Sequence, residues 1–225
     1  MTNSFPEKWG LDELLDKYPF LSLLPEKNGG LTISGRILES VVVPDGKRYD
    51  LDYRISMEVL QSFPSTYPFV KEVDGKIPDD FHKLRRGHLC LGSPLRLQLI
   101  TSKGKSLTAF VENVVLPYLA GHAADSLGDP MPFDELDHGE YALLEDYAEL
   151  FKLPTSVSAY QMLNLLTKSA RFAKNQPCPC GSSKKMRHCH QKIIAPMRKH
   201  LSSSDFRKAL KRVEDELERV KKLED

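Results

Sequence analysis

Residues 67–94 read YPFVKEVDGKIPDDFHKLRRGHLCLGSP and contain the one cysteine outside a compact cluster near the C-terminus. This residue, Cys90, is flanked by Leu89 and Leu91. Side chains alternate in direction along an extended backbone, so both leucines are predicted to point into a core. Cys90 is then expected to face outward or into a shallow groove. The Gly-Ser-Pro sequence that follows predicts irregular backbone just beyond it.

Two interpretations of Cys90 fit these residues. A thiol on a rigid loop at the edge of a groove is suited to act as a nucleophile, whereas free cysteines are also among the most buried residues. Nearby cations favour the thiolate and lower its pKa from about 8.5, while burial among apolar groups does the opposite. A basic run is also typical of a plain solvated face. The basic residues in the eight positions before Cys90 are His82, Lys83, Arg85, Arg86 and His88.

The sequence upstream identifies a family resemblance. An alternating stretch over residues 55–60 leads into Phe-Pro-Ser-Thr-Tyr-Pro-Phe at 63–69, and Gly-His-Leu-Cys-Leu follows at 87–91. This pattern resembles the ubiquitin-conjugating enzymes, in which a central strand ends in F-P-x-x-Y-P-F and the active-site loop closes with G-x-x-C-L. The interval from Tyr67 to Cys90 is 23 residues (90 − 67), close to the family spacing. The order of elements agrees from about residue 11 to residue 152.

The resemblance implies a function for Cys90. Its thiolate would accept a ubiquitin-like modifier from an activating enzyme, carry it as a thioester and pass it to an acceptor amine on a target protein. The family has Asn eight residues before the cysteine, where this chain has His82, so the resemblance transfers oxyanion stabilisation or loop ordering to His82. Val70-Lys71-Glu72 replaces the second proline-rich half of the family motif, which indicates a divergent prokaryotic branch. Bacterial relatives imply a role in antiphage defence.

Some members of the wider fold lack the cysteine and only bind ubiquitin-like partners. Conjugating enzymes often use an acidic residue after the active-site loop to receive or orient the incoming lysine. Asp134 and His138 are the candidates for that role here. The alternative is that these two residues have no catalytic role and belong to a polar loop and the capped start of the next helix.

The expected fold class is α+β: an antiparallel sheet meander packed by helices, as in ubiquitin-conjugating enzymes, plus a small zinc knuckle and a C-terminal helix. A helix is expected to begin the region 11–24, with Pro19 ending or kinking it. The expected strands cover residues 31–43, 49–60 and 68–73, with residues 95–101 a short strand or loop. The expected helices cover residues 106–120, with Ser106 as N-cap and a kink or early end at Pro117, then 139–153 and 156–174. Residues 121–135 are expected to form a connection.

A compact motif near the C-terminus predicts a metal site. Cys178-x-Cys180 is followed by eight residues and then by Cys189-His190. Three thiolates and an imidazole at this spacing select zinc in a closed tetrahedral site, which leaves no open position for metal catalysis. His188 is a competing ligand, and an unmetallated redox pair is the alternative. Gly181 permits the tight turn that brings backbone N–H groups to a sulfur.

This motif closely resembles the SEC-C module, found at the C-terminus of the SecA translocation ATPase and appended to many bacterial proteins. The resemblance implies a zinc-binding knuckle that contacts other proteins, and it supports Cys189-His190 as the final ligand pair. A non-catalytic adaptor is therefore the alternative to a conjugating enzyme. A SecA-like export adaptor is a third hypothesis, although it leaves residues 11–152 unexplained.

The predicted domains are a conjugating-enzyme-like domain over residues 1–153, a helical linker over 154–176, the knuckle over 177–192 and a charged helix over 193–225. In that helix Phe206, Leu210, Val213, Leu217 and Val220 repeat as a coiled-coil seam. The seam predicts either packing back onto the rest of the chain or dimerisation.

Charge is unevenly distributed along the chain. Residues 168–225 contain 16 Lys+Arg and 7 Asp+Glu, a balance of +9 (16 − 7), and the remainder carries −8 (16 − 24). This asymmetry predicts either that the two parts attract each other or that the basic part meets an acidic partner. Nucleic-acid binding is not favoured, because aromatic residues do not interleave with the basic ones. The absence of a long apolar run or secretory pattern and the metal-type cysteine usage predict a cytoplasmic protein without membrane insertion.

Overall fold

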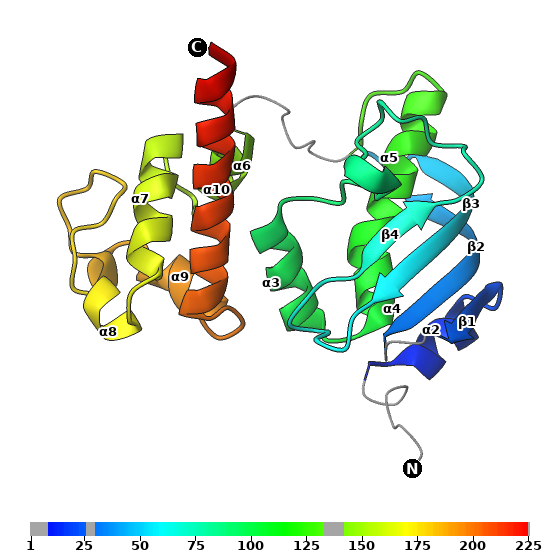
Figure 1. The fold of residues 1–225 in the computed structure, drawn as a ribbon, viewed down its shortest axis with the longest axis horizontal. Coiled ribbons are helices and arrows are strands. Elements are labelled where there is room, and N and C mark those ends of the chain that lie inside the picture. The colour runs from blue at the N-terminus through cyan, green and yellow to red at the C-terminus, as the bar shows by residue number, and fades with distance from the viewer. Residues whose placement is uncertain (1–8, 26–29, 133–141, 225) are drawn as a thin grey trace. The chain divides into compact units, whose positions relative to one another are not determined.

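The computed structural model describes residues 9–25, 30–132 and 142–224 (Figure 1). The chain divides into two compact units, one formed by Met1–Gly92 and Ile100–Glu135 and the other by Ser93–Leu99 and Leu136–Asp225. The elements of the first unit are α2 (Leu11–Lys17), β1 (Leu21–Pro25), β2 (Leu31–Val42), β3 (Arg48–Val59), β4 (Phe69–Glu72), η1 (Arg85–Gly87), α4 (Leu107–Phe110), η2 (Val111–Val115) and α5 (Leu116–Ser126). The helix α3 (Pro94–Gly104) contributes residues to both units, and the second unit also contains α6 (Ala142–Phe151), α7 (Ser156–Leu166), α8 (Ala170–Ala173), η3 (Met186–His188), α9 (Gln191–Met197) and α10 (Ser203–Glu224).

A four-stranded antiparallel sheet in the order β1-β2-β3-β4 forms the centre of the first unit. Strand β3 buries every second residue from Tyr49 to Val59, because alternate side chains face the same side of a sheet. The turn before it contains Gly46 at φ 87°, a left-handed conformation that glycine adopts without strain. The structure thus confirms the expected antiparallel meander and adds one strand to it.

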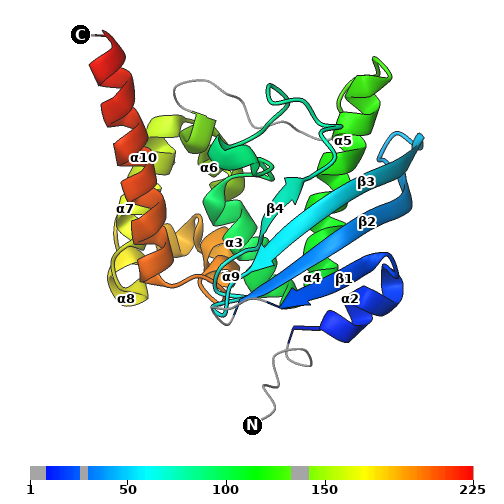
Figure 2. The same ribbon diagram turned by 45° about the vertical axis from the view of Figure 1, so that its right-hand side comes forward.

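The helical run α4-η2-α5 packs against this sheet through α5, which contacts β2 and β3 (Figure 2). Ser106 is the N-cap, as predicted, and its side chain accepts a hydrogen bond of 3.1 Å from Ala109 N. The helix neither ends at Pro117 nor stops at residue 120, but continues to Ser126. The π-helical turn η2 precedes Pro117 and shifts the backbone hydrogen-bond register, so the missing proline N–H is accommodated within the helix.

Strand β1 was not expected from the sequence, which placed its residues in a region beginning with a helix. The helix α2 ends at Lys17, two residues before Pro19, and the chain then pairs with β2. Gly35 makes this pairing possible, because a Cβ added there would lie 2.0 Å from Phe20 O. The φ of Gly35 is also +151°, which few other residues adopt.

The prediction of a short strand or loop at residues 95–101 is wrong, because these residues belong to α3. Leucines at 95, 97 and 99 imitate strand alternation. However, Ser93 Oγ accepts a 3.4 Å hydrogen bond from Arg96 N, and Pro94 occupies the first helical position. A capping serine followed by proline is a helix-start signal, and Leu95 and Leu99 share one face of the helix.

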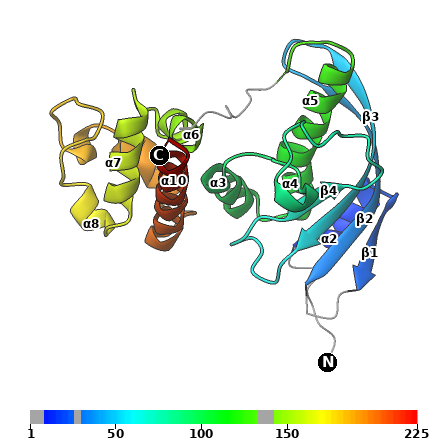
Figure 3. The same ribbon diagram turned by 45° about the horizontal axis from the view of Figure 1, so that its top comes forward.

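The second unit is helical (Figure 3). Its apolar core includes Tyr147, Phe151, Met162, Leu163 and Phe206. The expected single helix over residues 156–174 is broken into α7 and α8, because Ser169 caps a new helix by accepting from Phe172 N. Helix α10 packs against α7 and buries the first three residues of the predicted seam, Phe206, Leu210 and Val213. None of the described helices is long and apolar enough to cross a membrane. The predicted domain boundaries stay predictions.

Candidate functional site

Four predicted ligands lie together in the second unit. The ligand atoms of Cys178, Cys180, Cys189 and His190 all fall within 4.8 Å of one another. His190 Nδ1 lies 3.2 Å from both Cys178 Sγ and Cys189 Sγ, and Cys180 Sγ lies 3.5 Å from Cys178 Sγ and 3.4 Å from Cys189 Sγ. Three sulfurs and one nitrogen that converge in this way form a cluster that can hold a metal ion.

Local backbone geometry brings these ligands together. Gly181 has φ +78° and Ser183 has φ 59°, so the chain reverses immediately after Cys180. The backbone N–H groups of Cys180 and His190 donate to Cys178 Sγ, and the backbone N–H of Ser182 donates to Cys180 Sγ. Cys178 N also donates to Lys184 O at 2.8 Å, which closes the turn.

The cysteine thiols differ in their electrostatic surroundings. Burial raises the pKa of Cys178 to about 12. Burial also acts to raise the pKa of Cys180, but hydrogen bonds from the side chain and backbone of Ser182 and from the other two thiols lower it to about 6. Donors arranged around a sulfur stabilise a thiolate, which is the form that binds a metal. The donor set therefore fits zinc.

The ring of His190 is oriented from both sides. Its Nε2 lies 3.0 Å from the carbonyl oxygen of Lys152, which follows the C-terminal end of α6, so Nδ1 is left to face the sulfurs. Metal-binding histidines commonly donate their second N–H to such an acceptor. His188, the competing ligand, instead accepts a 2.9 Å hydrogen bond from Arg187 Nε and lies outside the cluster.

Cys90 lies in the first unit, in the segment that connects β4 to α3. Its N–H donates to His82 O at 2.7 Å, while Leu89 N donates to Val70 O of β4 at 2.8 Å. Leu89 is buried, whereas Cys90 and Leu91 are partly exposed. The backbone around Cys90 is thus fixed by hydrogen bonds. Its side chain is neither fully exposed, as a nucleophile at the edge of a groove would be, nor fully buried, as a structural cysteine would be.

The expected effect of the neighbouring cations on Cys90 is not found. Burial raises the pKa of the Cys90 thiol, and a backbone hydrogen bond from Gly92 only partly opposes this shift. One of the cations is engaged elsewhere, because Lys83 Nζ donates to Ile77 O at 2.6 Å and pairs with Asp79 at 3.2 Å. Desolvation of the thiolate therefore outweighs attraction to the basic run.

Three side chains behind this loop were missed by sequence reasoning. Tyr118 of α5 donates to Phe81 O at 3.1 Å and to His82 O at 3.2 Å. Tyr53 and His122 are buried and share a 2.7 Å hydrogen bond. Tyr118 and His122 lie one helical turn apart, on the face of α5 toward the sheet. Their hydrogen-bond partners are 36 to 69 positions away in the sequence, so no local pattern predicts these contacts.

His82 contributes its backbone to the loop, with φ 39° and a carbonyl that accepts from both Cys90 and Tyr118. Its ring packs edge-on against Phe81, with centroids 5.0 Å apart. The two candidates for receiving or orienting the acceptor lysine, Asp134 and His138, lie outside the described residues.

Comparison with known proteins identifies the C-terminal motif. A family model described as the SEC-C motif matches residues 175–192. The protein translocase subunit SecA of Ectopseudomonas mendocina (strain ymp) is 33% identical over 70 residues, or 31% of this chain and 7% of that protein. The chain thus matches only a small part of the length of that relative. No solved structure matches the chain. The resemblance of the first unit to conjugating enzymes rests on residues 63–69 and 87–91.

Proposed function

We propose that this chain binds one zinc ion through Cys178, Cys180, Cys189 and His190 and uses the folded knuckle as a protein-binding module. The convergence of these four ligand atoms within 4.8 Å carries the proposal. Four protein ligands close the coordination shell, so the metal has a structural role and leaves no position for a reacting water.

The knuckle depends on this metal for its fold. Its short segment has few apolar side chains to bury, with Met186 and Cys178 the main contributions. Three thiolates at close range repel one another unless a cation lies between them, so zinc binding supplies folding free energy. The bound ion would fix the turn at Gly181 and the side chains on its outer surface.

Elemental analysis of the purified chain tests this proposal. We expect one zinc per chain, lost in Cys178→Ser and in His190→Ala. His188→Ala is the matched control, since it removes an imidazole two residues away that lies outside the cluster. Retention of stoichiometric zinc by His190→Ala and its loss in His188→Ala would reassign the ligand.

We also propose that the first unit is a conjugating enzyme for a ubiquitin-like modifier. The partly exposed Cys90 on a hydrogen-bonded loop supports this function, together with the flanking motifs. The Cys90 thiolate attacks the thioester carbonyl on the activating enzyme, whose own thiolate leaves. An acceptor amine of the target then attacks the new thioester, forming an amide, while the Cys90 thiolate leaves and the amine proton passes to solvent. His82 orders the loop through its carbonyl.

Incubation with an activating enzyme, its modifier and ATP tests this second proposal. A thiol-sensitive adduct is expected on the wild-type chain and none on Cys90→Ala. Cys90→Ser should give an adduct that resists thiols, because an oxygen ester replaces the thioester. A chain that forms no adduct acts instead as a non-catalytic adaptor through its knuckle.

A further inference from the structure

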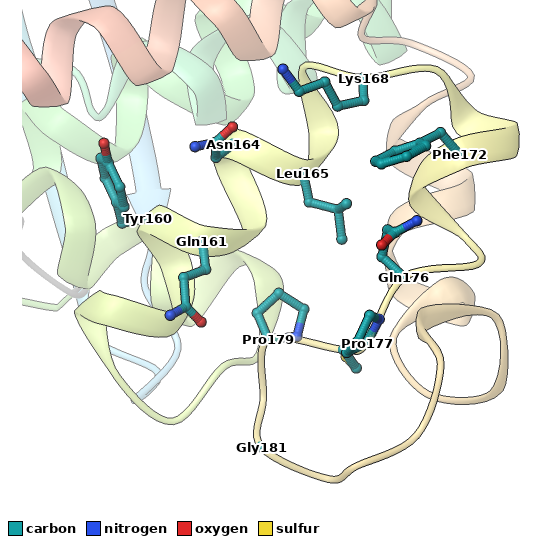
Figure 4. A pocket seen from close by; sticks show the side chains of 11 residues that line it. Tyr160, Gln161, Asn164, Leu165, Lys168, Phe172, Gln176, Pro177, Pro179 and Gly181 are labelled. Carbon is teal, nitrogen blue, oxygen red and sulfur yellow. The ribbon is translucent and has the colours of Figure 1, made fainter.

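A groove of about 510 Å³ lies on the second unit, between α7, α8 and the segment that enters the knuckle (Figure 4). Its apolar lining consists of Tyr160, Leu165, Phe172, Pro177 and Pro179. Phe172 is 51% exposed, which is unusual for a large aromatic side chain within a folded unit. Exposed aromatic rings beside prolines form the kind of surface on which extended peptides pack.

The polar residues of this groove are suited to bind a peptide backbone. Gln161, Asn164 and Gln176 provide amide groups, each with donors and an acceptor. Lys168 is the one cation among the described lining residues, and its ammonium group makes no ion pair with any described residue. In Figure 4 it extends along the edge between Asn164 and Phe172.

The charge of the surrounding segment favours an acidic ligand. Residues 168–192 contain seven Lys+Arg and no Asp or Glu. A zinc ion with three thiolates adds −1, so the segment keeps a balance of +6 (7 − 1). A carboxylate lies at the other end of the groove, where Glu214 of α10 accepts a 3.1 Å hydrogen bond from the Tyr160 hydroxyl. Negative charge on a ligand is therefore favoured at the Lys168 end and disfavoured at the Tyr160 end.

We propose that this groove binds an extended acidic segment of a partner polypeptide. An aromatic or proline side chain of the segment packs on Phe172 and Pro177, and a carboxylate beside it pairs with Lys168. The inference rests on the proposed protein-binding role of the knuckle and specifies the chemistry of its partner. A nucleic acid fits less well, because a phosphate backbone needs a row of cations and the lining provides one.

The groove is also coupled to the metal cluster. Cys178 belongs to the lining, between Pro177 and Pro179, and is at the same time a proposed zinc ligand. Loss of the ion would release the turn that holds both prolines. Removal of zinc is therefore expected to weaken peptide binding even though no groove residue has been changed.

Selection from a random dodecapeptide display library tests the inference on the zinc-loaded full chain. Peptides that bind the wild type but not Lys168→Glu are expected to be enriched in Asp or Glu next to aromatic residues or proline. The selected peptide is then synthesised with a fluorophore, and its affinity is measured by anisotropy. Failure to enrich any peptide that discriminates between the two chains would overturn the inference.

Matched variants locate the binding surface. Lys168→Glu and Phe172→Ser should each weaken binding of the selected peptide about tenfold, the effect of losing one good contact. Lys199→Glu makes the same change of charge at an exposed position outside the groove and should change affinity less than about twofold. Equal losses from Lys168→Glu and Lys199→Glu would show diffuse attraction and contradict a groove.

A single-stranded RNA of twelve nucleotides is the competitor. Displacement of the peptide by this RNA at lower concentration than by unlabelled peptide would assign the surface to nucleic acid and overturn the inference. Zinc analysis of the same preparations separates the two proposals. A chain with one zinc and no peptide binding contradicts only the groove. A chain that is purified without zinc contradicts the metal proposal, and undiminished peptide binding by that chain also contradicts the coupling between the groove and the metal cluster.

Discussion

At the scale of single residues, burial is the dominant influence on the pKa of the Cys90 thiol, which it raises. We expect the alkylation rate of Cys90 by iodoacetamide to rise with pH with a midpoint above the ordinary thiol value of about 8.5, because the buried thiolate is poorly solvated. Peptide-resolved mass spectrometry of the zinc-loaded chain measures this rate separately from the knuckle cysteines.

The control is Arg86→Gln, which removes an exposed cation from the loop and should leave the midpoint unchanged. Unfolding in urea should bring the midpoint down to the ordinary value. A midpoint below 8.5 in the folded chain, raised by Arg86→Gln, would mean that the basic run and not burial controls the thiol.

The hydroxyl of Tyr118 orders the same loop from α5. Tyr118→Phe keeps the ring, whose centroid lies 5.7 Å from that of Phe81, but removes the donor to the carbonyls of residues 81 and 82. The loss should cost about 1 kcal/mol of unfolding free energy, and Cys90 should be alkylated faster because its loop opens more often. Urea denaturation and the alkylation assay measure the two effects.

Tyr49→Phe provides a matched comparison, because Tyr49 donates a 2.9 Å hydrogen bond to Asp129 elsewhere in the same unit. It should lower stability to a similar extent without changing the alkylation rate. If both variants accelerate alkylation equally, the effect reflects general destabilisation and Tyr118 has no special role at the loop.

At the scale of elements, α6 holds the start of α3 through a buried carboxylate. Asp146 is 7% exposed and accepts hydrogen bonds from Ser93 Oγ and from Arg96 Nε, the latter at 2.9 Å. Asp146→Ala should cost about 3 kcal/mol of unfolding free energy, because it leaves the half-buried guanidinium of Arg96 without its main partner. Chemical denaturation followed by circular dichroism measures the loss.

Glu149→Ala is the exposed counterpart, since Glu149 pairs with the same guanidinium at 3.2 Å but its side chain is 65% exposed. It should cost less than about 1 kcal/mol. The double variant Arg96→Met with Asp146→Leu should recover much of the stability lost in Asp146→Ala, because it removes the charge and its partner together. Equal costs for the two carboxylates would show that burial does not strengthen this pair.

Local patterns predicted those elements whose cause is local. The alternation of buried and exposed side chains in β3 and the N-cap at Ser106 each depend on residues close together in the sequence. The structure contains both features. Strand β1 depends instead on the space left by Gly35 in another strand, and the break between α7 and α8 depends on a cap that competes with a continuous helix. At residues 95–101 the leucine alternation outweighed the Ser93-Pro94 signal in our prediction, although the capping geometry determines the structure.

The same distinction applies to the candidate sites. All four proposed metal ligands lie within 13 residues, so their spacing alone brings them together. The loop that holds Cys90 is bound by β4 and α5, and the sequence provides no sign that Tyr118 contacts the carbonyl of His82. The basic residues near Cys90 therefore do not lower its pKa as the sequence suggested. The burial that raises this pKa comes from elements distant in the sequence, which neighbouring residues do not reveal.

The molecule as a whole contains two compact units, and only one of them includes the proposed metal ligands. The first buries its own sheet residues, such as Ile33, Ile55 and Met57, and the second has a separate core around Phe151 and Met162. We therefore expect two unfolding transitions in scanning calorimetry. Zinc in excess should raise the midpoint of one transition only, since a ligand at about 1,000 times its Kd stabilises the state that binds it by about 4 kcal/mol.

Assignment of the transitions requires a reporter in each unit. Trp9 is buried in the first unit and is the chain's one tryptophan, so its fluorescence should follow the transition that does not respond to zinc. A chelator should lower the other transition in the wild type and have no effect in Cys178→Ser, which has already lost the ion. If the Trp9 transition moves with zinc as far as the other, the two units unfold as one, and the metal stabilises the sheet as well as the helical unit.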